Sequence, residues 1–385
     1  MKTILCVSLA IILLYGCKKD SDPAPDYNCE CQPNGKNILS ILIHQATGLF
    51  PYENENHRWG FIDQNGSIIY GASYADAQLF SGNRAMVIDD KYGVQYAGYL
   101  DAAGTMAVPA KYRLVSESYF SSEGMAPMGD IKKWLFGYID MNGQAVIPFQ
   151  YDHTTKFNEG LAVVYKGSKA GVIDATGNIV IPIEYESITT FSEGLALVFR
   201  KGEKRGYLTP LNQYKFQGDF IQGTIFMYGL AVVDDPKSQL LGFINTDGQF
   251  VIQPQFTSAC VFSEGLAAVQ INNKWGFIDL SGNFVIEPQF DDVLIGFCGG
   301  LAPVMKNSNW GYIDQSGNFV ITPQFDDADL FYCGLAKVWF INGTIGYVNK
   351  SGEIVYRSKQ TLTKKTDRPK ISSALLKYNI RIGKD

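Results

Sequence analysis

The sequence predicts an all-β protein, built as a tandem array of about nine three-stranded antiparallel repeats. The first observation is a short motif that recurs nine times at intervals of 34 to 39 residues. In this motif a glycine is followed by an aromatic or aliphatic residue, then an aliphatic residue and usually an aspartate. A fixed period of this size is typical of stacked copies of one supersecondary unit. The second is the composition, since 39 glycines and 51 aromatic residues with only 18% charged residues favour short strands and tight turns. The nine anchor glycines are Gly60, Gly98, Gly137, Gly171, Gly206, Gly242, Gly276, Gly311 and Gly346.

Each copy contains three expected strands, and the seventh copy is a clear example. It opens with Gly-Leu-Ala-Ala-Val at 265–269, which predicts the first strand. After a polar loop, Trp-Gly-Phe-Ile-Asp at 275–279 forms the second strand, and Ser-Gly-Asn at 281–283 forms a turn. The apolar residues 284–286 form the third strand. Two strands joined by Gly-Asn predict a hairpin, because both residues tolerate the positive φ of a tight turn.

A proline follows the third strand in six copies and is expected to end that strand, because it has no N–H to donate. A connector then leads to Phe-Ser-Glu-Gly, as at 262–265. Tryptophan precedes the anchor glycine in only three copies, so the glycine is the stricter requirement and indicates close backbone approach or an unusual φ. The fifth copy, around Gly206, lacks the aspartate and the Gly-Asn turn and is the expected weak point or bend. The six prolines are Pro109, Pro148, Pro182, Pro254, Pro288 and Pro323.

One three-stranded meander is marginal by itself, so the units must bury their faces against each other. We expect an open, gently superhelical, solenoid-like array. The alternative is a closed β-propeller, for which nine blades would be unusually many, and the order of the strands leaves no obvious strand to close a ring.

These motifs resemble the WG (or KWG) repeat family of bacterial proteins. Trp-Gly-x-Ile-Asp, Val-Ile-x-Pro-x-Phe-Asp and Phe-Ser-Glu-Gly-Leu-Ala recur in this order at constant spacing over about residues 48–356. The first two copies depart from the pattern, with Tyr70-Gly71 in place of the proline step in one of them, and so does the fifth. The resemblance implies tandem β units and gives no settled activity, so no catalytic, cofactor-binding or metal-binding residue is carried over to this chain.

The first 16 residues predict an export signal, because Met1-Lys2 is followed by an apolar run that is too short to span a bilayer. The run ends in Leu-Leu-Tyr-Gly before Cys17 and resembles the lipobox of bacterial lipoproteins. That resemblance implies cleavage before Cys17 and acylation of this cysteine, which anchors the chain in a membrane. No aspartate follows Cys17, so the inner-membrane retention signal is absent and the outer membrane is the expected location, facing the periplasm or the cell surface. An ordinary signal peptide with a coincidental cysteine is the other interpretation.

The remaining cysteines allow several interpretations. Cys29 and Cys31 are too close in sequence for an unstrained mutual disulfide, and no further Cys/His cluster completes a metal site with them. Cys298 and Cys333 are one repeat apart, so neighbouring units could bring them together as a disulfide in an oxidising compartment. The favoured interpretation of these two is that both are buried and unpaired.

The candidate chemical groups are few. The histidines His44, His57 and His153 share no metal-ligand spacing, and no nucleophile elbow or phosphate loop is present. The aspartates that end the second strands could form a row of carboxylates that binds calcium or a cationic ligand. The favoured role is to accept N–H bonds in the turn that follows each one. Paired carboxylates at 291–292 and 326–327 could serve acid–base chemistry, although their repetition favours architecture. These recurrent aspartates are Asp63, Asp101, Asp140, Asp174, Asp279 and Asp314.

The domain organisation follows from these features: signal peptide 1–16, lipidated flexible tether 17–36, repeat domain 37–356 and basic tail 357–385. The tail holds nine Lys or Arg against two Asp, while the whole chain has a net charge of -5, which is too mild to indicate a nucleic-acid partner. The sequence predicts a non-catalytic binding or scaffold lipoprotein of the bacterial envelope, without cofactor, with the repeats as a protein or glycan interaction surface. Exposed aromatic residues are the expected contacts, although most aromatics are expected in the core. The alternative is a glycan-active enzyme or its accessory subunit.

Overall fold

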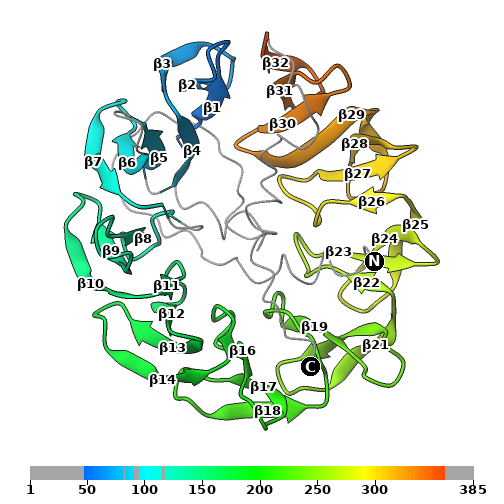
Figure 1. Cartoon of the computed structure of the whole chain (residues 1–385). Helices are drawn as coiled ribbons and strands as arrows, with labels where there is room; N and C mark the ends of the chain where they lie inside the picture. The colour runs from blue at the N-terminus through cyan, green and yellow to red at the C-terminus, as the bar shows by residue number, and fades with distance from the viewer. Residues whose placement is uncertain (1–46, 82, 91–94, 115–117, 360–385) are drawn as a thin grey trace, which may run out of the picture.

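A computed structural model describes residues 47–81, 83–90, 95–114 and 118–359 of the chain, and in these residues it is all-β. The predicted array is confirmed: nine units follow one another in chain order around a central axis, each containing one anchor glycine (Figure 1). No helix in the described part of the chain is long and apolar enough to cross a membrane. The signal peptide, the tether with Cys17, residues 37–46 and residues 360–385 of the tail lie outside the described residues.

The strands are assigned to the units as follows. Unit 1 comprises β1 (Phe50–Glu53), β2 (Trp59–Ile62) and β3 (Ile68–Tyr74). Unit 2 comprises β4 (Asp76–Ser81), β5 (Arg84–Asp89), β6 (Tyr96–Asp101) and β7 (Met106–Tyr112). Unit 3 comprises β8 (Met125–Gly129), β9 (Phe136–Asp140) and β10 (Ala145–Tyr151). Unit 4 comprises β11 (His153–Thr154), β12 (Leu161–Lys166), β13 (Lys169–Asp174) and β14 (Ile179–Tyr185). Unit 5 comprises β15 (Ser187–Ile188), β16 (Ala196–Phe199), β17 (Arg205–Leu208) and β18 (Tyr214–Gly218). Unit 6 comprises β19 (Leu230–Asp234), β20 (Leu241–Asn245) and β21 (Phe250–Phe256). Unit 7 comprises β22 (Ser258–Ala259), β23 (Ala267–Ile271), β24 (Lys274–Ile278) and β25 (Phe284–Phe290). Unit 8 comprises β26 (Asp292–Val293), β27 (Ala302–Lys306), β28 (Asn309–Ile313) and β29 (Phe319–Tyr332). Unit 9 comprises β30 (Leu335–Phe340), β31 (Ile345–Asn349) and β32 (Ile354–Arg357).

Each unit contains the predicted antiparallel meander, and the connector adds a short strand that the sequence did not indicate. In unit 7, for example, β24 pairs with β23 on one side and with β25 on the other, while β22 pairs with β23. The added strand lies on the inner side of its sheet, toward the central axis (Figure 1). In units 3 and 6 a single bridge replaces it, between Arg113 and Gly129 and between Gly223 and Val233. In the last two units one long strand, β29, joins both sheets.

The prolines do not end the third strands, so this prediction was wrong. β25, for example, continues through Pro288 to Phe290. Its pairing with β24 shifts between Ile286 and Phe290, so the proline lies in a β-bulge. β25 is also the outer edge of its sheet, where the missing N–H of proline leaves no ladder bond unmade.

The bulge explains the anchor glycine. A Cβ on Gly276 would lie 2.5 Å from the carbonyl oxygen of Ile286 and 2.8 Å from the nitrogen of Pro288. Gly311 meets Ile321 and Pro323 in the same way, at 2.5 and 2.7 Å. None of these glycines has a positive φ. The close backbone approach predicted from the sequence is therefore confirmed, and the unusual φ is not the reason for the glycine.

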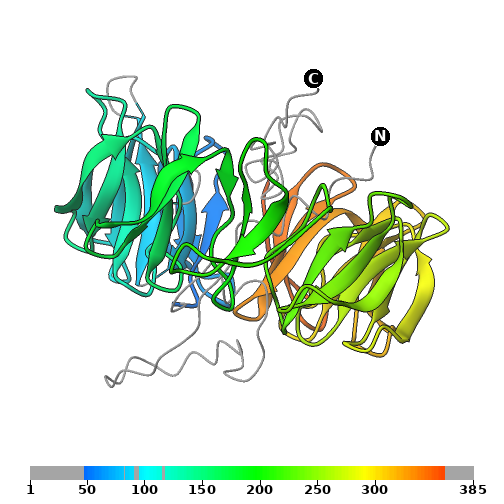
Figure 2. The same ribbon diagram turned by 90° about the horizontal axis from the view of Figure 1, so that it is seen from below.

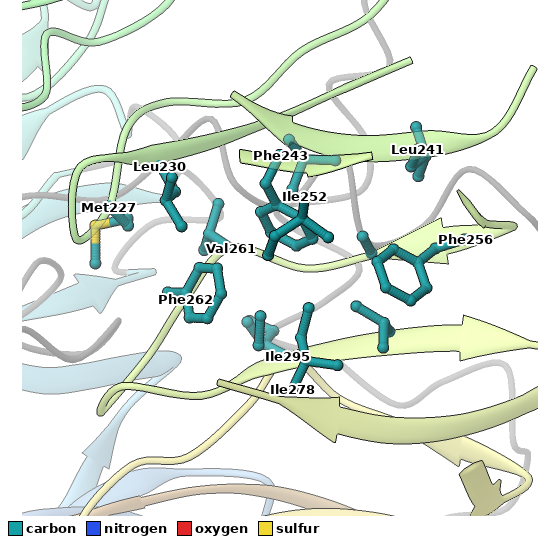
Figure 3. Packing of buried hydrophobic residues seen from close by; sticks show 14 of the residues in the cluster. Met227, Leu230, Leu241, Phe243, Ile252, Phe256, Val261, Phe262, Ile278 and Ile295 are labelled. Atoms are coloured by element: carbon teal, nitrogen blue, oxygen red, sulfur yellow. The ribbon is translucent and has the colours of Figure 1, made fainter. Parts of the chain in front are cut away.

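Neighbouring units share their hydrophobic cores. Figure 3 shows the cluster between units 6 and 7, in which Phe243 and Ile252 pack against Val261 and Phe262. Phe243 and Phe262 have ring centroids 5.1 Å apart, which is typical of a tilted aromatic pair. In addition, the turn glycine of most units lies against an aliphatic or aromatic residue in the third strand of the preceding unit, as Gly282 does against Ile252. Stability therefore depends on contacts between consecutive units, as in other repeat proteins.

The two ends of the array meet. No strand of unit 1 pairs with a strand of unit 9, so the β-ladders of the described residues leave the array open, and its two halves lie at an angle to each other (Figure 2). Gly66 of unit 1 nevertheless lies against Val355 of unit 9, in the contact that consecutive units make elsewhere. The hydroxyl of Tyr347 donates to the carbonyl of Pro51 at 2.8 Å, and that of Tyr356 to Glu53 at 3.0 Å. Side chains thus join the first and last units, while the β-ladders remain open as the sequence predicts.

The fifth unit keeps its hairpin despite its divergent sequence. β17 pairs with β18, and Asn212 adopts a φ of 56° in the turn between them. Asparagine tolerates this conformation better than most residues, which explains why the turn forms without glycine. At the end of the array, β32 extends to Arg357, one residue beyond the predicted boundary of the repeat domain.

Candidate functional site at the junction of the first and last units

The recurrent aspartates are turn residues, as the favoured interpretation predicts. The Oδ1 of Asp279 accepts the N–H groups of Ser281 and Asn283, both at 2.9 Å. These backbone bonds, chiefly the one from Asn283, lower the pKa of the Asp279 carboxyl. Asn245 and Asn349 accept the equivalent bonds in units 6 and 9, so the position requires an acceptor and not a charge. The same pair of bonds is formed by Asp63, Asp101, Asp140, Asp174 and Asp314.

The paired carboxylates also have architectural partners. Asp291 accepts the N–H of Asn307 at 2.7 Å and a bond from the ammonium of Lys274 at 2.6 Å. Asp292 and Asp327 each accept the N–H of the following residue. Over the described residues, no group of three or more His, Cys, Asp or Glu has the arrangement of a metal site.

The other sequence candidates lie apart from one another. His57 is exposed and contacts Glu53, with Nδ1 2.8 Å from Oε1. His153 is in β11, where burial lowers the pKa of its imidazole. His44 lies outside the described residues. Cys298 is a buried thiol that forms no disulfide, and its Sγ donates to the carbonyl of Phe331 at 3.2 Å. Cys333 is disulfide-bonded, so the alternative pairing of these two cysteines was wrong, and so was the favoured interpretation that Cys333 is unpaired.

Sequence reasoning missed the role of the glutamate in Phe-Ser-Glu-Gly. The carboxylate of Glu159, in the variant Phe-Asn-Glu-Gly of this motif, accepts the N–H groups of Glu193 and Gly194 in the next unit, at 2.7 and 2.8 Å. Glu264 accepts those of Gly299 and Gly300 in the same way. The recurrence of the motif was the available signal, but only the structure reveals that its carboxylate joins two units.

A lysine and an aspartate whose pKa values are both shifted lie where unit 9 meets unit 1. The ammonium of Lys337, on β30, lies 5.0 Å from the ring centroid of Trp59 in β2 and 5.4 Å from that of Trp339. Burial lowers the pKa of Lys337, while the carboxylates of Asp329, Asp76 and Glu53 oppose this shift. We call Lys337, Asp329, Asp76, Glu53 and Trp59 the junction cluster.

Asp329 is the least satisfied member of the junction cluster. Its Oδ2 is shielded from solvent and accepts no hydrogen bond from the described residues. Burial raises the pKa of its carboxyl to about 7, although the charge of Lys337 opposes the shift. The residue as a whole is half-buried, so water reaches part of the cluster.

Other units carry uncharged residues at these two positions. The hydroxyl of Tyr312 donates to the carbonyl of Asp329, as Tyr207 does to Thr224 and Tyr138 to Thr155. Asp329 therefore occupies the place of a threonine. Eight residues later, Lys337 occupies the place of Val163 and Val232, whose N–H groups bond to those threonines. A charged pair thus replaces Thr–Val where unit 9 meets unit 1.

Aromatic side chains are mostly core residues, and the exposed apolar residues are mainly aliphatic. Among the described residues, Trp134 and Phe250 are the aromatics with a large exposed surface. The outer strands instead expose valine or isoleucine in most units. These exposed residues are Ile68, Ile69, Val146, Ile179, Val251, Val285, Val320 and Ile354.

Comparison with known proteins agrees with this architecture. A family model described as "WG containing repeat" matches residues 59–92, 136–169, 171–204, 242–275, 275–310 and 310–338, which is more than half of the chain. A solved structure titled as a eukaryotic initiation factor is similar over 81% of this chain and 96% of its own, with 13% identity and a TM-score of 0.51, so the likeness concerns the fold alone. Weaker likenesses include the computationally designed Ika8 protein (14% identity, 62% of this chain and 84% of that chain, TM-score 0.41) and BamB from Moraxella catarrhalis (11% identity, 52% and 71%, TM-score 0.36). A search of curated protein sequences found no match.

Proposed function

Because the chain belongs to the WG containing repeat family, we propose that it is a non-catalytic scaffold that binds other proteins at the bacterial envelope. The observation that carries this proposal is the repeated outer strand. It is the edge of its sheet in every unit except the eighth, where β29 pairs with β30 only from Phe325 onward. Aliphatic side chains such as Val285 and Val320 are exposed on it at one-repeat spacing. An exposed edge strand with apolar side chains can pair with an extended segment of a partner.

The bulge limits this surface. Between Ile286 and Phe290, the proline and the shifted register interrupt the regular edge of β25. Residues before the bulge, 284–286, remain available for pairing on their outer side. A partner would therefore contact a short segment of each unit, and several units together would supply the affinity.

Position-specific cross-linking tests the scaffold. A photoreactive residue at Val285 is expected to capture envelope proteins, because this side chain is exposed on the outer edge. The matched control is Ser281, which is exposed in the adjoining turn. Val285→Lys should abolish the capture by a reporter at Val320 if both positions belong to one surface. Equal capture from Val285 and Ser281, or release of products from envelope or dietary glycans by the purified protein, would contradict the proposal and favour the glycan-active alternative.

We also propose that Cys17 carries the lipid that holds the ring at the outer membrane. Replacement of Cys17 by alanine removes the thiol that receives the acyl-bearing group. Incorporation of labelled palmitate should then be lost, and the protein should disappear from the outer-membrane fraction. Cys298→Ala, which removes a buried thiol, is the control and should retain the label. Unchanged labelling of the Cys17 variant would show that the anchor has been misplaced.

A further inference from the structure

The loop between β8 and β9 of unit 3 exposes apolar and basic side chains together. Trp134 is 64% exposed and Ile131 is 38% exposed, although both are large and apolar. Lys132 and Lys133 lie between them and are also exposed. An exposed cluster of this kind marks an interaction site more often than a random surface does.

The backbone holds this loop in one conformation. The N–H of Trp134 donates to the carbonyl of Asp130 at 3.1 Å, and the carboxylate of Asp130 accepts the N–H groups of Lys132 and Lys133 at 2.7 and 2.8 Å. These bonds lower the pKa of the Asp130 carboxyl. Trp134 has a φ of 59°, a conformation that bulky residues rarely adopt. A strained residue held in place in this way suggests a function for its side chain.

Unit 6 contains the same loop with different side chains. Asp235 bonds to the N–H of Gln239 at 2.8 Å, and Gln239 has a φ of 57°. The residues that correspond to 131–134 are Pro-Lys-Ser-Gln at 236–239. The fold therefore forms this loop without an isoleucine, a second lysine or a tryptophan. Folding does not account for Trp134 and Ile131.

A further cation contacts the tryptophan, and another lies in β7. The guanidinium of Arg113 lies 3.6 Å from the centroid of a Trp134 ring, which is close enough for a cation–π contact. Lys111 and Leu114 of the adjoining segment are exposed. Lys111, Arg113, Lys132 and Lys133 thus give four positive charges, while the one carboxylate in the loop, Asp130, is used by the backbone.

We propose that the loop of residues 130–135, with Lys111, Arg113 and Leu114, docks on the headgroup region of an anionic phospholipid bilayer. Tryptophan favours the membrane interface because its ring is apolar and its N–H is polar. Lysines next to it are attracted by anionic lipids. The proposal rests on the proposed membrane location, because an acyl chain on Cys17 would keep the ring near the bilayer. The loop then supplies a second, weaker contact that orients the ring on the membrane.

The test uses the chain from Lys18 onward, which keeps all described residues and carries no acyl group. Its partition is measured by flotation with vesicles of phosphatidylglycerol and phosphatidylethanolamine, and with phosphatidylcholine vesicles for comparison. The wild-type chain should bind the anionic vesicles, and Trp134→Gln, which copies the residue of unit 6, should weaken binding about tenfold. Removal of Lys132 or Lys133 should weaken it about fivefold each, and high salt should weaken the wild type.

A graft of residues 236–239 in place of 131–134 is the matched control for folding, since both loops share one backbone geometry. The grafted chain should melt at the wild-type temperature and fail to bind vesicles. The proposal would be overturned if the wild-type and grafted chains bound the anionic vesicles equally, or if the wild type did not bind them. Capture of a protein by this loop without vesicle binding would also overturn it. Because the acyl group is absent, these outcomes are independent of the Cys17 experiment.

Discussion

Replacement of Gly276 by alanine is expected to destabilise the protein by about 3 kcal/mol, one of the two largest effects that the structure predicts. The added Cβ would lie 2.5 Å from the carbonyl oxygen of Ile286 and 2.8 Å from the nitrogen of Pro288. Both are backbone atoms of the bulge, so no side-chain rotation relieves the clash. β24 and β25 would have to separate, and the core shared with unit 6 would lose its packing. Urea unfolding followed by tryptophan fluorescence measures the change as a lower midpoint.

Gly71→Ala is the matched control for this prediction. Gly71 is also in a strand, but a Cβ there has no neighbour within 4 Å and its φ is not positive. This substitution should leave stability within about 0.5 kcal/mol of the wild type or increase it, because alanine restricts the unfolded chain. Similar midpoints for the two alanine variants would mean that the close approach at Gly276 is not what requires glycine.

Replacement of Lys337 by methionine is expected to destabilise the protein by about 3 kcal/mol at pH 8, through the contact between units 9 and 1. The substitution keeps the length of the side chain but removes the ammonium that faces Asp329. The Oδ2 of Asp329 then remains shielded from solvent, without the ammonium and without a hydrogen bond from the described residues. Urea unfolding at pH 8 measures the loss.

The double variant Asp329→Thr, Lys337→Val is its control, because it gives the junction the Thr–Val pair of other units. It should recover most of the stability lost by Lys337→Met, since an uncharged pair needs no compensation for burial. If Lys337→Met were as stable as the wild type, or the double variant as unstable as the single one, the junction cluster would not support the contact between units 9 and 1.

The titration of Asp329 supplies a second readout of the same variants. Its pKa is raised to about 7 in the folded chain, so the folded state binds the proton more tightly than the unfolded state. Stability is therefore full below the ordinary carboxyl pKa of about 4 and falls as the pH rises through 7. The wild type should lose on the order of 2 kcal/mol between pH 5 and pH 8, after allowance for partial solvation of the cluster. The double variant should lose this part of the pH dependence.

The features that could be predicted from sequence are those repeated in every unit. The role of Asp279 in its turn and the close approach at Gly276 were both predicted, because local chemistry and a ninefold recurrence point to them. Pro288 was misinterpreted, since the rule that proline ends a strand holds for central strands and not for a bulged outer edge. The bond from Glu264 to the next unit was missed because nothing in a single motif identifies the partner of a carboxylate.

The candidate site could not be predicted for a related reason. Asp329 and Lys337 differ from the repeat pattern, but a deviation in one copy does not reveal which distant residues it faces. Their neighbour Trp59 lies more than 250 residues earlier in the chain. The exposure of Trp134 could not be predicted from sequence either, because most tryptophans in this chain pack inside the units. Only the conformation of its loop distinguishes Trp134 from the others.

The sequence by itself determined the unit, its ninefold repetition, its turns and the requirement for glycine, because these depend on contacts within about one period of the chain. Only the tertiary structure decided that the ends of the array meet, that a charged pair lies at that junction and that one loop exposes a tryptophan. The small rotation between consecutive units determines whether nine of them return to their starting point. That rotation is a sum over many packing contacts, such as those between Ile252 and Gly282, and no single motif encodes it.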